Sequence, residues 1–267
     1  MKRILVYIFV FAGLVSGAFL TSCGDDAPST NPAYYTPGGY WTGSVNGEPG
    51  VALVNESGDF TFIASDGEQW PGTLAITDPS DSSLTPYGAS FTGSMQGLTA
   101  GGYPNYGVAN PPFVNCVFTS GTIVPRQSIN GTAACISPAQ TYNIEVSWTF
   151  SALYSVPSAL ATISGTYDDT ATGTVFTINS NGTVFAQDAT TGCVINGTVS
   201  IISPSYGVYG IQVSYANCTG SSAQLNNVTL AGMVALDSTK SPEQLLAGVW
   251  TSGLPVLSVT YALVRTM

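Results

Sequence analysis

Histidine is absent from the 267 residues of this chain, and its absence removes much of familiar enzyme chemistry. Ser-His-Asp and Cys-His nucleophilic arrangements need an imidazole base, and catalytic zinc sites and most haem sites need imidazole ligands. The sequence also lacks a G-x-S-x-G nucleophile elbow, a P-loop and a Rossmann fingerprint. A general base would therefore have to be a carboxylate whose pKa is raised by burial. We predict that the protein is not an enzyme and that it needs no cofactor and no metal.

Basic side chains are almost as scarce, because lysine and arginine together number 5 against 15 aspartates and glutamates. Nucleic-acid binding depends on Lys and Arg side chains that neutralise phosphates, so a nucleic-acid partner is excluded. An anionic membrane surface would repel the chain for the same reason. Lys, Glu and Arg are infrequent while Thr, Val, Tyr and Ile are common, and this balance favours strands over helices.

The first residues of the chain have the pattern of an export signal. Lys2 and Arg3 precede an apolar stretch over residues 4–20, and small residues then lead to Cys23. A positive start, a short apolar core and small residues before a cleavage site are typical of such signals. The apolar stretch is also short for a comfortable membrane span.

The run Leu20-Thr21-Ser22-Cys23 resembles the lipobox of bacterial lipoproteins, in which an apolar residue and two small residues precede a cysteine. The resemblance implies that residues 1–22 are removed and that Cys23 carries diacylglycerol and palmitate as the first residue of the mature chain. It implies a lipid-anchored protein of the cell envelope. Gly24 stands where an aspartate would resemble an inner-membrane retention signal, which favours the outer membrane. The alternative is an ordinary secretory signal in which Cys23 is incidental.

Removal of the signal would leave 267 − 22 = 245 residues with a formal charge of 3 − 15 = −12. This length fits two domains or one large β domain. The Pro-rich start of the mature chain, residues 23–37, has no periodic apolar pattern and is predicted to be a lipidated flexible tether. After it the sequence repeats at an offset of about 122 to 126 residues. We therefore predict two β modules, over residues 38–160 and 161–267.

The internal repeat consists of segments that match in the same order, namely 39–43 with 165–168, 50–65 with 173–187, and 72–80 with 197–205. Apolar and polar residues alternate between turn signals, for example over 174–178 and 256–261, which is typical of strands. We predict antiparallel meanders that close into barrels, with a β-sandwich as the alternative. Residues 241–246 give the one expected helical turn, because Ser, Pro and Glu follow the order of a helix start.

Four cysteines remain besides Cys23, and their number predicts two disulfides in an exported chain. They are Cys116, Cys135, Cys193 and Cys218. Of the three possible connectivities we expect Cys116–Cys135 and Cys193–Cys218, because each pair flanks a predicted hairpin or two neighbouring strands. Free buried thiols are the alternative. A zinc site is disfavoured by the lack of a CxxC spacing and of histidine.

An irregular stretch over residues 96–112 interrupts the first copy and has no counterpart in the second. Loops of this length often carry function. Its Tyr103 and Tyr106 are candidates to stack on a sugar or a peptide. The alternative is an exposed insertion without a ligand.

Three pairs of carboxylates are candidates for acid–base chemistry, namely Asp168 with Asp169, Asp78 with Asp81, and Asp66 with Glu68. Two carboxylates about 5–10 Å apart can serve a glycosidase. Each pair is local, however, and aspartate is common in turns because it bonds its own backbone. We expect exposed turns, with Ca²⁺ binding or catalysis as alternatives. The four tryptophans (Trp41, Trp70, Trp148 and Trp250) are expected in the core or at the barrel ends.

Gly39-Tyr40-Trp41 and Gly248-Val249-Trp250 are similar to the Gly-x-Trp that begins lipocalin-like barrels. The second copy has Tyr167 in place of that tryptophan, and no arginine is a clear match for the one that closes a lipocalin barrel. The resemblance implies an envelope location and non-catalytic binding. We therefore expect a lipoprotein that binds a small molecule, a glycan or a protein. The alternatives are a structural surface lipoprotein with solid barrels and a carboxylate-dependent glycosidase.

Overall fold

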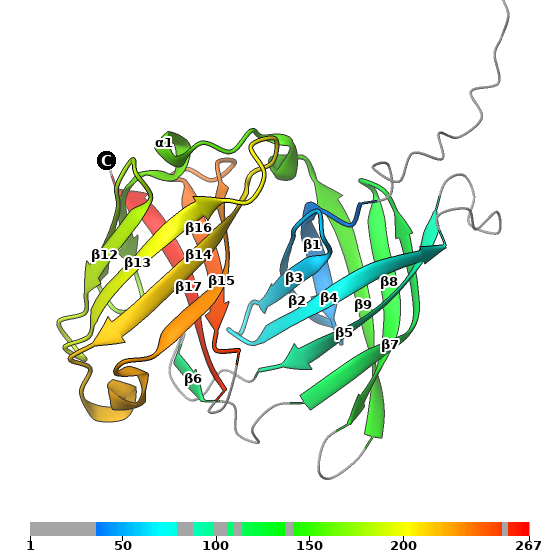
Figure 1. Cartoon of the computed structure of the whole chain (residues 1–267), viewed down its shortest axis with the longest axis horizontal. Coiled ribbons are helices and arrows are strands. Elements are labelled where there is room, and N and C mark those ends of the chain that lie inside the picture. Colours follow the sequence, from blue (N-terminus) through cyan, green and yellow to red (C-terminus); the bar gives the residue numbers. More distant parts are fainter. Residues whose placement is uncertain are drawn as a thin grey trace, which may run out of the picture.

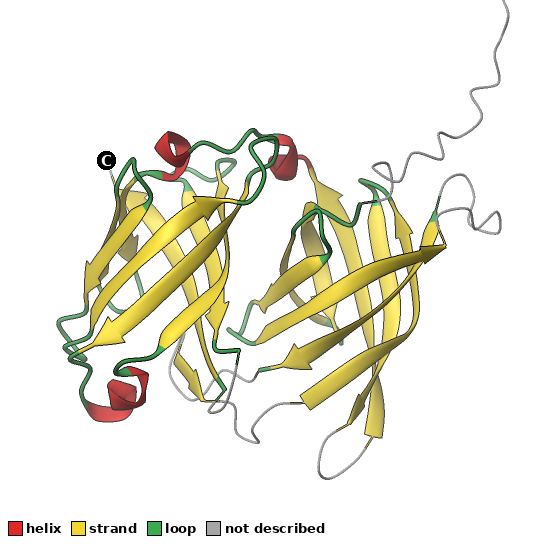
Figure 2. Ribbon diagram, in the orientation of Figure 1, coloured by secondary structure: helices red, strands yellow, loops and turns green. Residues whose placement is uncertain are grey.

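The computed structural model describes residues 36–78, 88–98, 106–108, 114–136, 141–252 and 256–266. Within them the chain is almost entirely β-strand (Figure 2). Two antiparallel barrels of eight strands each lie side by side (Figure 1). The expectation of an all-β fold with two tandem, barrel-like modules is confirmed.

Each barrel is a meander whose last strand returns to pair with its first. The first barrel contains β1 (Gly39–Val45), β2 (Glu48–Val54), β3 (Asp59–Ala64), β4 (Gln69–Asp78), β5 (Ala89–Gly97), β7 (Val114–Val124), β8 (Ser128–Ile136) and β9 (Thr141–Ser151). The second contains β10 (Gly165–Asp169), β11 (Thr174–Ile178), β12 (Thr183–Gln187), β13 (Val194–Ile201), β14 (Val208–Ala216), β15 (Thr229–Asp237), β16 (Gln244–Trp250) and β17 (Leu257–Thr266). Pairing of β1 with β9 and of β10 with β17 closes the two barrels.

Alternation along each strand separates a barrel interior from an outer face. In β9, Ile144, Val146 and Trp148 are buried, whereas Glu145 and Ser147 between them are exposed. Full burial of a large apolar side chain contributes about 1.5–3 kcal/mol. A slip of one residue would expose the whole inward set, so the hydrophobic pattern fixes the strand register.

The same glycine turn links the second and third strands of each barrel. Gly58 has a φ of +92° and Gly182 a φ of +86°, which glycine adopts without the steric cost of a Cβ. The Gly58 carbonyl accepts a hydrogen bond from the amide of Leu74 at 2.8 Å. The Gly182 carbonyl accepts one from the amide of Val199 at 2.7 Å. The matching segments of the sequence therefore have matching turns.

Both disulfides have the predicted pairing. Cys116 and Cys135 lie directly opposite each other on β7 and β8. Cys193 precedes β13 and Cys218 follows β14, so this bond joins the ends of two paired strands across 25 residues. A disulfide that closes a loop of this size stabilises the folded state by roughly 3 kcal/mol, because it lowers the conformational entropy of the unfolded chain.

The expected helical turn over residues 241–246 is wrong, because Gln244–Trp250 is strand β16. Leu245, Ala247 and Val249 alternate into the second barrel, and β16 pairs with β15 and β17 on its two sides. A gap of one strand would leave the barrel open, so tertiary pairing overrides the helix-start signal. The short helices are instead η2 (Ala152–Ser155), α1 (Leu160–Ile163) and η3 (Gly220–Leu225).

The insertion over residues 96–112 is not simply an exposed loop. Its segment β6 (Tyr106–Val108) pairs with Leu257–Val259 at the start of β17 and so joins the sheet of the second barrel (Figure 1). The short strand β10 pairs with β17 only from Leu263 to Thr266, which leaves the start of β17 open on that side. A strand from the first half of the chain fills this position.

The two barrels contact each other through their outer faces, where β2 and β3 meet β15 and β16. Gly248 has no side chain at the point where Ile63 and Gln69 approach. The Gln69 side-chain amide donates a hydrogen bond to the Thr260 hydroxyl at 2.8 Å. A buried apolar cluster shared by both barrels adjoins this contact and contains Tyr40, Leu53, Tyr154, Val208, Met233 and Ala235.

The helix η2 begins the connection between the barrels and is held by aromatic side chains. Tyr154 stacks on Tyr206 with ring centroids 4.6 Å apart, and its hydroxyl donates a hydrogen bond to Glu56 at 2.6 Å. Burial and this bond to Glu56 raise the pKa of Tyr154. Arg126 lies over the Tyr206 ring at 5.8 Å. In the described part of the chain, no helix has the length and apolar character needed to cross a membrane.

Candidate functional site

Both barrel interiors are filled by side chains. In the first, Trp148 is 1% exposed and its ring lies 5.3 Å from that of Phe60 and 5.9 Å from that of Phe62. In the second, the hydroxyls of Tyr215 and Tyr261 share a hydrogen bond in the core. A lipocalin-like ligand would need an apolar cavity in such an interior. Two hollows formed by described residues lie between the barrels instead.

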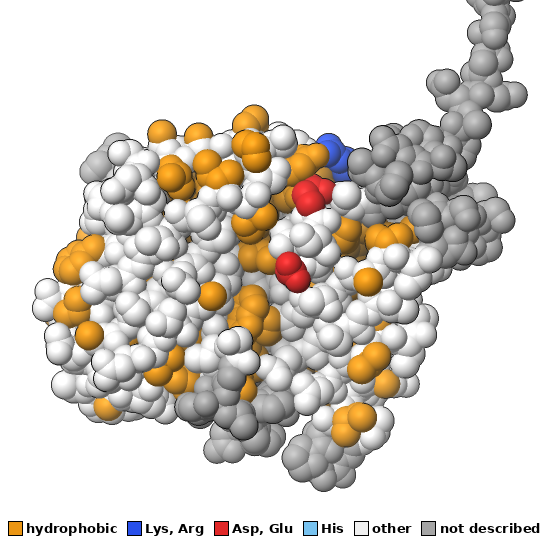
Figure 3. Space-filling view, viewed as in Figure 1, with side chains coloured by type: hydrophobic (Ala, Val, Ile, Leu, Met, Phe, Trp, Pro, Cys, Tyr) orange, Lys and Arg blue, Asp and Glu red, His pale blue; other side chains and the backbone are white. Residues whose placement is uncertain are grey.

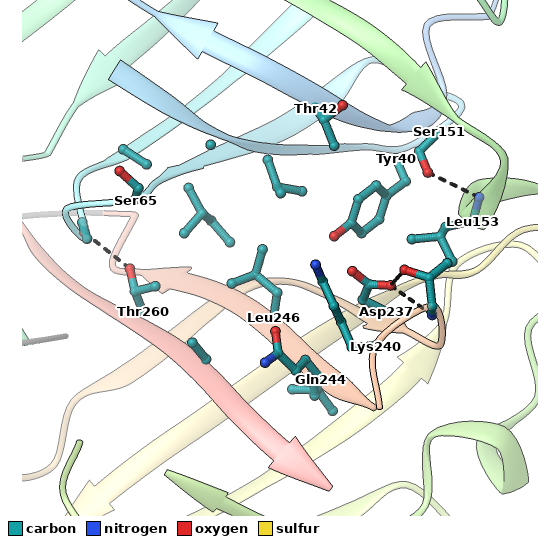
Figure 4. Close-up of a pocket in the computed structure, with 18 of the residues that line it drawn as sticks. Tyr40, Thr42, Ser65, Ser151, Leu153, Asp237, Lys240, Gln244, Leu246 and Thr260 are labelled. Atoms are coloured by element: carbon teal, nitrogen blue, oxygen red, sulfur yellow. Dashed lines mark hydrogen bonds between the residues drawn. The ribbon is translucent and has the colours of Figure 1, made fainter. Parts of the chain in front are cut away.

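A cleft of about 650 Å³ lies between the first barrel and one end of the second (Figure 4). We call it the polar cleft. The first barrel contributes side chains from β1, β2 and β3, and the second contributes the β15–β16 turn and parts of β16 and β17. Its hydrogen-bonding side chains are Tyr40, Thr42, Ser65, Asp66, Ser151, Asp237, Thr239, Lys240, Gln244 and Thr260.

Tyr40, Asp237 and Lys240 lie together at one end of the polar cleft (Figure 4). Burial, and then the charge of Asp237, raise the pKa of Tyr40 to about 12, so its hydroxyl keeps its proton. Asp237 accepts hydrogen bonds from the backbone amide and the hydroxyl of Thr239 at 3.0 and 2.5 Å. Lys240 is exposed and forms no ion pair with any described carboxylate. This end therefore offers a hydroxyl, a carboxylate and an ammonium group to a ligand.

Asp66 lines the other end of the polar cleft, and two carboxylates that do not line it, Glu48 and Glu68, lie close to Asp66. Burial, and then the nearby charges of Asp66 and Glu48, raise the pKa of Glu68. The Ser65 hydroxyl donates a hydrogen bond to Glu48 at 2.5 Å, and the backbone amide of Glu68 donates one to Asp66 at 3.0 Å. Asp66 and Glu68 thus form a turn, as the sequence predicted. Across the described residues, no three Cys, Asp or Glu side chains are placed to hold a metal ion.

The remaining carboxylate pairs show no catalytic arrangement where they are described. Asp169 is the last residue of β10, where the chain enters a turn, and it is only 3% exposed, which corrects the expectation of an exposed turn. Its carboxylate accepts bonds from the Ala171 amide and the Thr172 hydroxyl, both at 2.9 Å, so it is buried as the bonded centre of that turn. Asp81 lies outside the described residues, as does the side chain of Asp78.

A second hollow of about 850 Å³ lies between the outer faces of β5 and β7 on the first barrel and β14 to β16 on the second. We call it the uncharged groove, because Asp59 is its one ionisable lining residue. Trp250 lines it and is half-buried, whereas Trp41, Trp70 and Trp148 are buried in the first barrel. The four tryptophans were expected in the core or at the barrel ends; three lie in the core of the first barrel, and Trp250 is the last residue of β16 and lines the groove.

The other candidate residues are only partly placed by the structure. Cys23 and Tyr103 lie outside the described residues, and the described backbone of Tyr106 belongs to β6. The sequence offered no clear match for a barrel-closing arginine. In the second barrel, Arg265 is such an arginine. It lies on β17, which closes the barrel by pairing with β10, and its guanidinium carbon is 5.3 Å from the centre of the Tyr167 ring.

Comparison with known proteins adds no family to these observations. No protein-family model, curated protein or solved structure matches the chain. Functional inference therefore depends on the N-terminal motif and on the two hollows between the barrels.

Proposed function

We propose that this protein is a lipid-anchored lipoprotein of the bacterial cell envelope that binds a small polar molecule, without catalysis, in the polar cleft. The observation that carries the binding proposal is the contrast between filled barrel interiors and a cleft lined by side chains from both barrels. Ligand sites commonly occur where two domains meet and combine apolar walls with a few polar groups.

The envelope location is supported by two independent features. The lipobox-like run ends at Cys23, and two disulfides stabilise the barrels, as is typical of oxidising compartments. Two or more acyl chains would give stable anchoring. A mature chain with a formal charge of 3 − 15 = −12 has no basic surface that could replace the lipid.

A non-catalytic role is supported by the carboxylates. Asp66, Asp169 and Asp237 each accept a hydrogen bond from the backbone amide two residues further along the chain, which is the ordinary structural use of aspartate at a turn. No histidine is available as a base. Should no ligand bind the polar cleft, the filled interiors would favour the alternative of a structural surface lipoprotein.

Cys23→Ser should abolish lipid attachment, because serine has no thiol for thioether formation. We expect unprocessed precursor that incorporates no labelled palmitate and is absent from the outer-membrane fraction, in which we expect the wild-type protein. Fatty-acid labelling followed by membrane fractionation measures both. Normal processing and membrane retention of the variant would contradict the lipoprotein proposal, and wild-type protein in the inner membrane would contradict the outer-membrane location.

Binding in the polar cleft can be tested with three sugars that share one ring shape but differ in charge. Two aspartates face one lysine there, so attraction should be strongest for a cation. We expect glucosamine to bind more tightly than glucose, and glucose more tightly than glucuronate. Isothermal titration of the mature lipoprotein in nanodiscs measures all three.

Gln244→Ala should weaken glucosamine binding by roughly three- to ten-fold, because one hydrogen bond is lost. Gln187→Ala is the matched control, since Gln187 is also exposed on a strand but lies on β12, outside the cleft. Lack of binding by all three sugars at millimolar concentration, or equal effects of the two variants, would contradict a small-molecule site in the polar cleft.

A further inference from the structure

The uncharged groove is a site of different chemistry from the polar cleft. Its lining combines amides and hydroxyls with apolar side chains such as Val117 and Met233, and it contains no lysine or arginine. Of its two aromatic residues, Phe60 is buried in the first barrel and Trp250 is half-buried. The single carboxylate, Asp59, already accepts a hydrogen bond from the Asn55 side chain at 2.9 Å. Hydrophobic side chains are visible along the furrow between the barrels, on a face with few charged groups (Figure 3). An anionic ligand would find no partner of opposite sign in this groove.

Trp250 forms a fixed platform on the second barrel. Its ring packs against the backbone of the neighbouring strand at Gly232, where a Cβ would lie 2.9 Å from Trp250 Cζ3. Because Gly232 has no side chain, the indole ring can lie against the backbone there. Any larger residue at this position would occupy the same space. The tryptophan remains half-buried and lines the groove. An indole held in this way can stack on an apolar ligand face without losing side-chain entropy on binding.

Amide side chains lie at set positions around this platform. Gln212, Ala231 and Trp250 are directly paired across β14, β15 and β16, so they share one line across the outer face of the sheet. The small side chain of Ala231 leaves space between the amide and the indole. Across the groove, the Gln96 amide donates a hydrogen bond to Asn115 at 3.2 Å, which orients this pair. Each wall therefore presents amide groups that can donate and accept.

From these features we infer that the uncharged groove binds an uncharged glycan. A pyranose ring has an apolar C–H face and a rim of hydroxyls, which match an indole platform flanked by Gln and Asn side chains. A lipid chain would leave the lining amides without partners, at a cost for each desolvated group. The hollow of about 850 Å³ is within the range of ligand sites and is open along the furrow. This inference concerns a site separate from the polar cleft and does not depend on the small-molecule proposal.

The test titrates the mature lipoprotein in nanodiscs with cellohexaose, maltohexaose and a hexamer of galacturonate. We expect at least one neutral hexamer to bind and the galacturonate hexamer to bind at least ten-fold more weakly. Trp250→Ala should weaken binding by about ten-fold or more, Trp250→Phe by less, and Gln212→Ala by roughly three- to ten-fold. Gln187→Ala should have no effect, and far-ultraviolet circular dichroism verifies that each variant is folded.

Three outcomes would overturn the inference. They are failure of both neutral hexamers to bind at millimolar concentration, equal binding of the charged hexamer, and neutral-hexamer binding that survives Trp250→Ala. Binding of the apolar dye anilinonaphthalene sulfonate in a Trp250-dependent way, without any hexamer binding, would assign the groove to an apolar peptide instead. Loss of hexamer binding in Gln244→Ala would place the glycan in the polar cleft.

Discussion

Gly58→Ala should lower the free energy of unfolding by about 3–4 kcal/mol. Two separate effects contribute. A φ of +92° is unfavourable for any residue with a Cβ, at a cost of about 1–2 kcal/mol. The added methyl would also lie 1.9 Å from the Leu74 carbonyl oxygen, and relieving such a contact costs about 1–3 kcal/mol. Chemical denaturation followed by circular dichroism measures the change.

Gly47 provides the matched control. Its φ is +83°, but nothing lies within 4 Å of a Cβ placed there, so Gly47→Ala suffers only the conformational cost. Gly182→Ala, at the equivalent turn of the second barrel, meets the Val199 carbonyl oxygen at 2.4 Å and should be as damaging as Gly58→Ala. Equal destabilisation by Gly47→Ala and Gly58→Ala would show that the contact with Leu74 contributes nothing.

Arg265→Ala should destabilise the second barrel by about 3 kcal/mol. The guanidinium donates hydrogen bonds to the carbonyl oxygens of Thr162 and Ser164 at 2.7 and 2.6 Å, and it forms an ion pair with Glu243. It also lies over the Tyr167 ring, whose pKa burial raises to about 12 although the guanidinium opposes this shift. Hydrogen bonds to charged groups contribute about 1.5–3 kcal/mol, and a cation on an aromatic ring adds about 1 kcal/mol.

Arg265→Lys separates charge from geometry. Lysine keeps the positive charge but cannot direct two donors in a planar fork, so it should recover less than half of the lost stability. Arg126→Ala is the control, since Arg126 is exposed and also lies over aromatic rings, but its two side-chain hydrogen bonds are both 3.5 Å long and it forms no ion pair with a described carboxylate. Destabilisation by Arg126→Ala as large as that by Arg265→Ala would contradict the importance of the barrel-closing contacts.

Local rules of the chain were enough to predict most of the fold. Alternation in β11 and β17, the turn glycines Gly58 and Gly182, and the four cysteines all act over short stretches of sequence. Such signals predict strands, hairpins and local disulfides because the partners are close in the chain. The order of strands in a meander then follows from the same short connections.

Long-range pairing could not be predicted in the same way. Residues 241–246 carry a helix-start signal. Gln244–Trp250 is nevertheless extended, because it pairs with β15 on one side and β17 on the other and so completes the eight strands of the second barrel. The pairing of Tyr106–Val108 with β17 joins residues about 150 positions apart. No local pattern specifies a contact between residues so far apart. Closing such a long loop has an entropic cost, which is offset only by the contacts of the completed barrel.

The two hollows were beyond sequence reasoning for a related reason. Each is formed where two finished barrels meet, so its lining residues are scattered over several strands. Trp250 was predicted, with the other tryptophans, to lie in the core or at a barrel end rather than in a ligand site. The pairing of Trp250 with Ala231, beside Gly232, shows that small residues surround this tryptophan on the sheet surface. That pairing can be recognised only when the strand register is known.

Pairing of β6 with β17 also sets an order of events during synthesis. Val108 emerges 257 − 108 = 149 residues before its partner Leu257. At 5–20 residues per second the wait lasts roughly 7–30 s. The first barrel can close as soon as Ser151 has emerged, while residues 106–108 stay unpaired until the last strand arrives. Completion of this sheet by β6 therefore requires that residues 106–108 and β17, which lie far apart in the chain, have both been made.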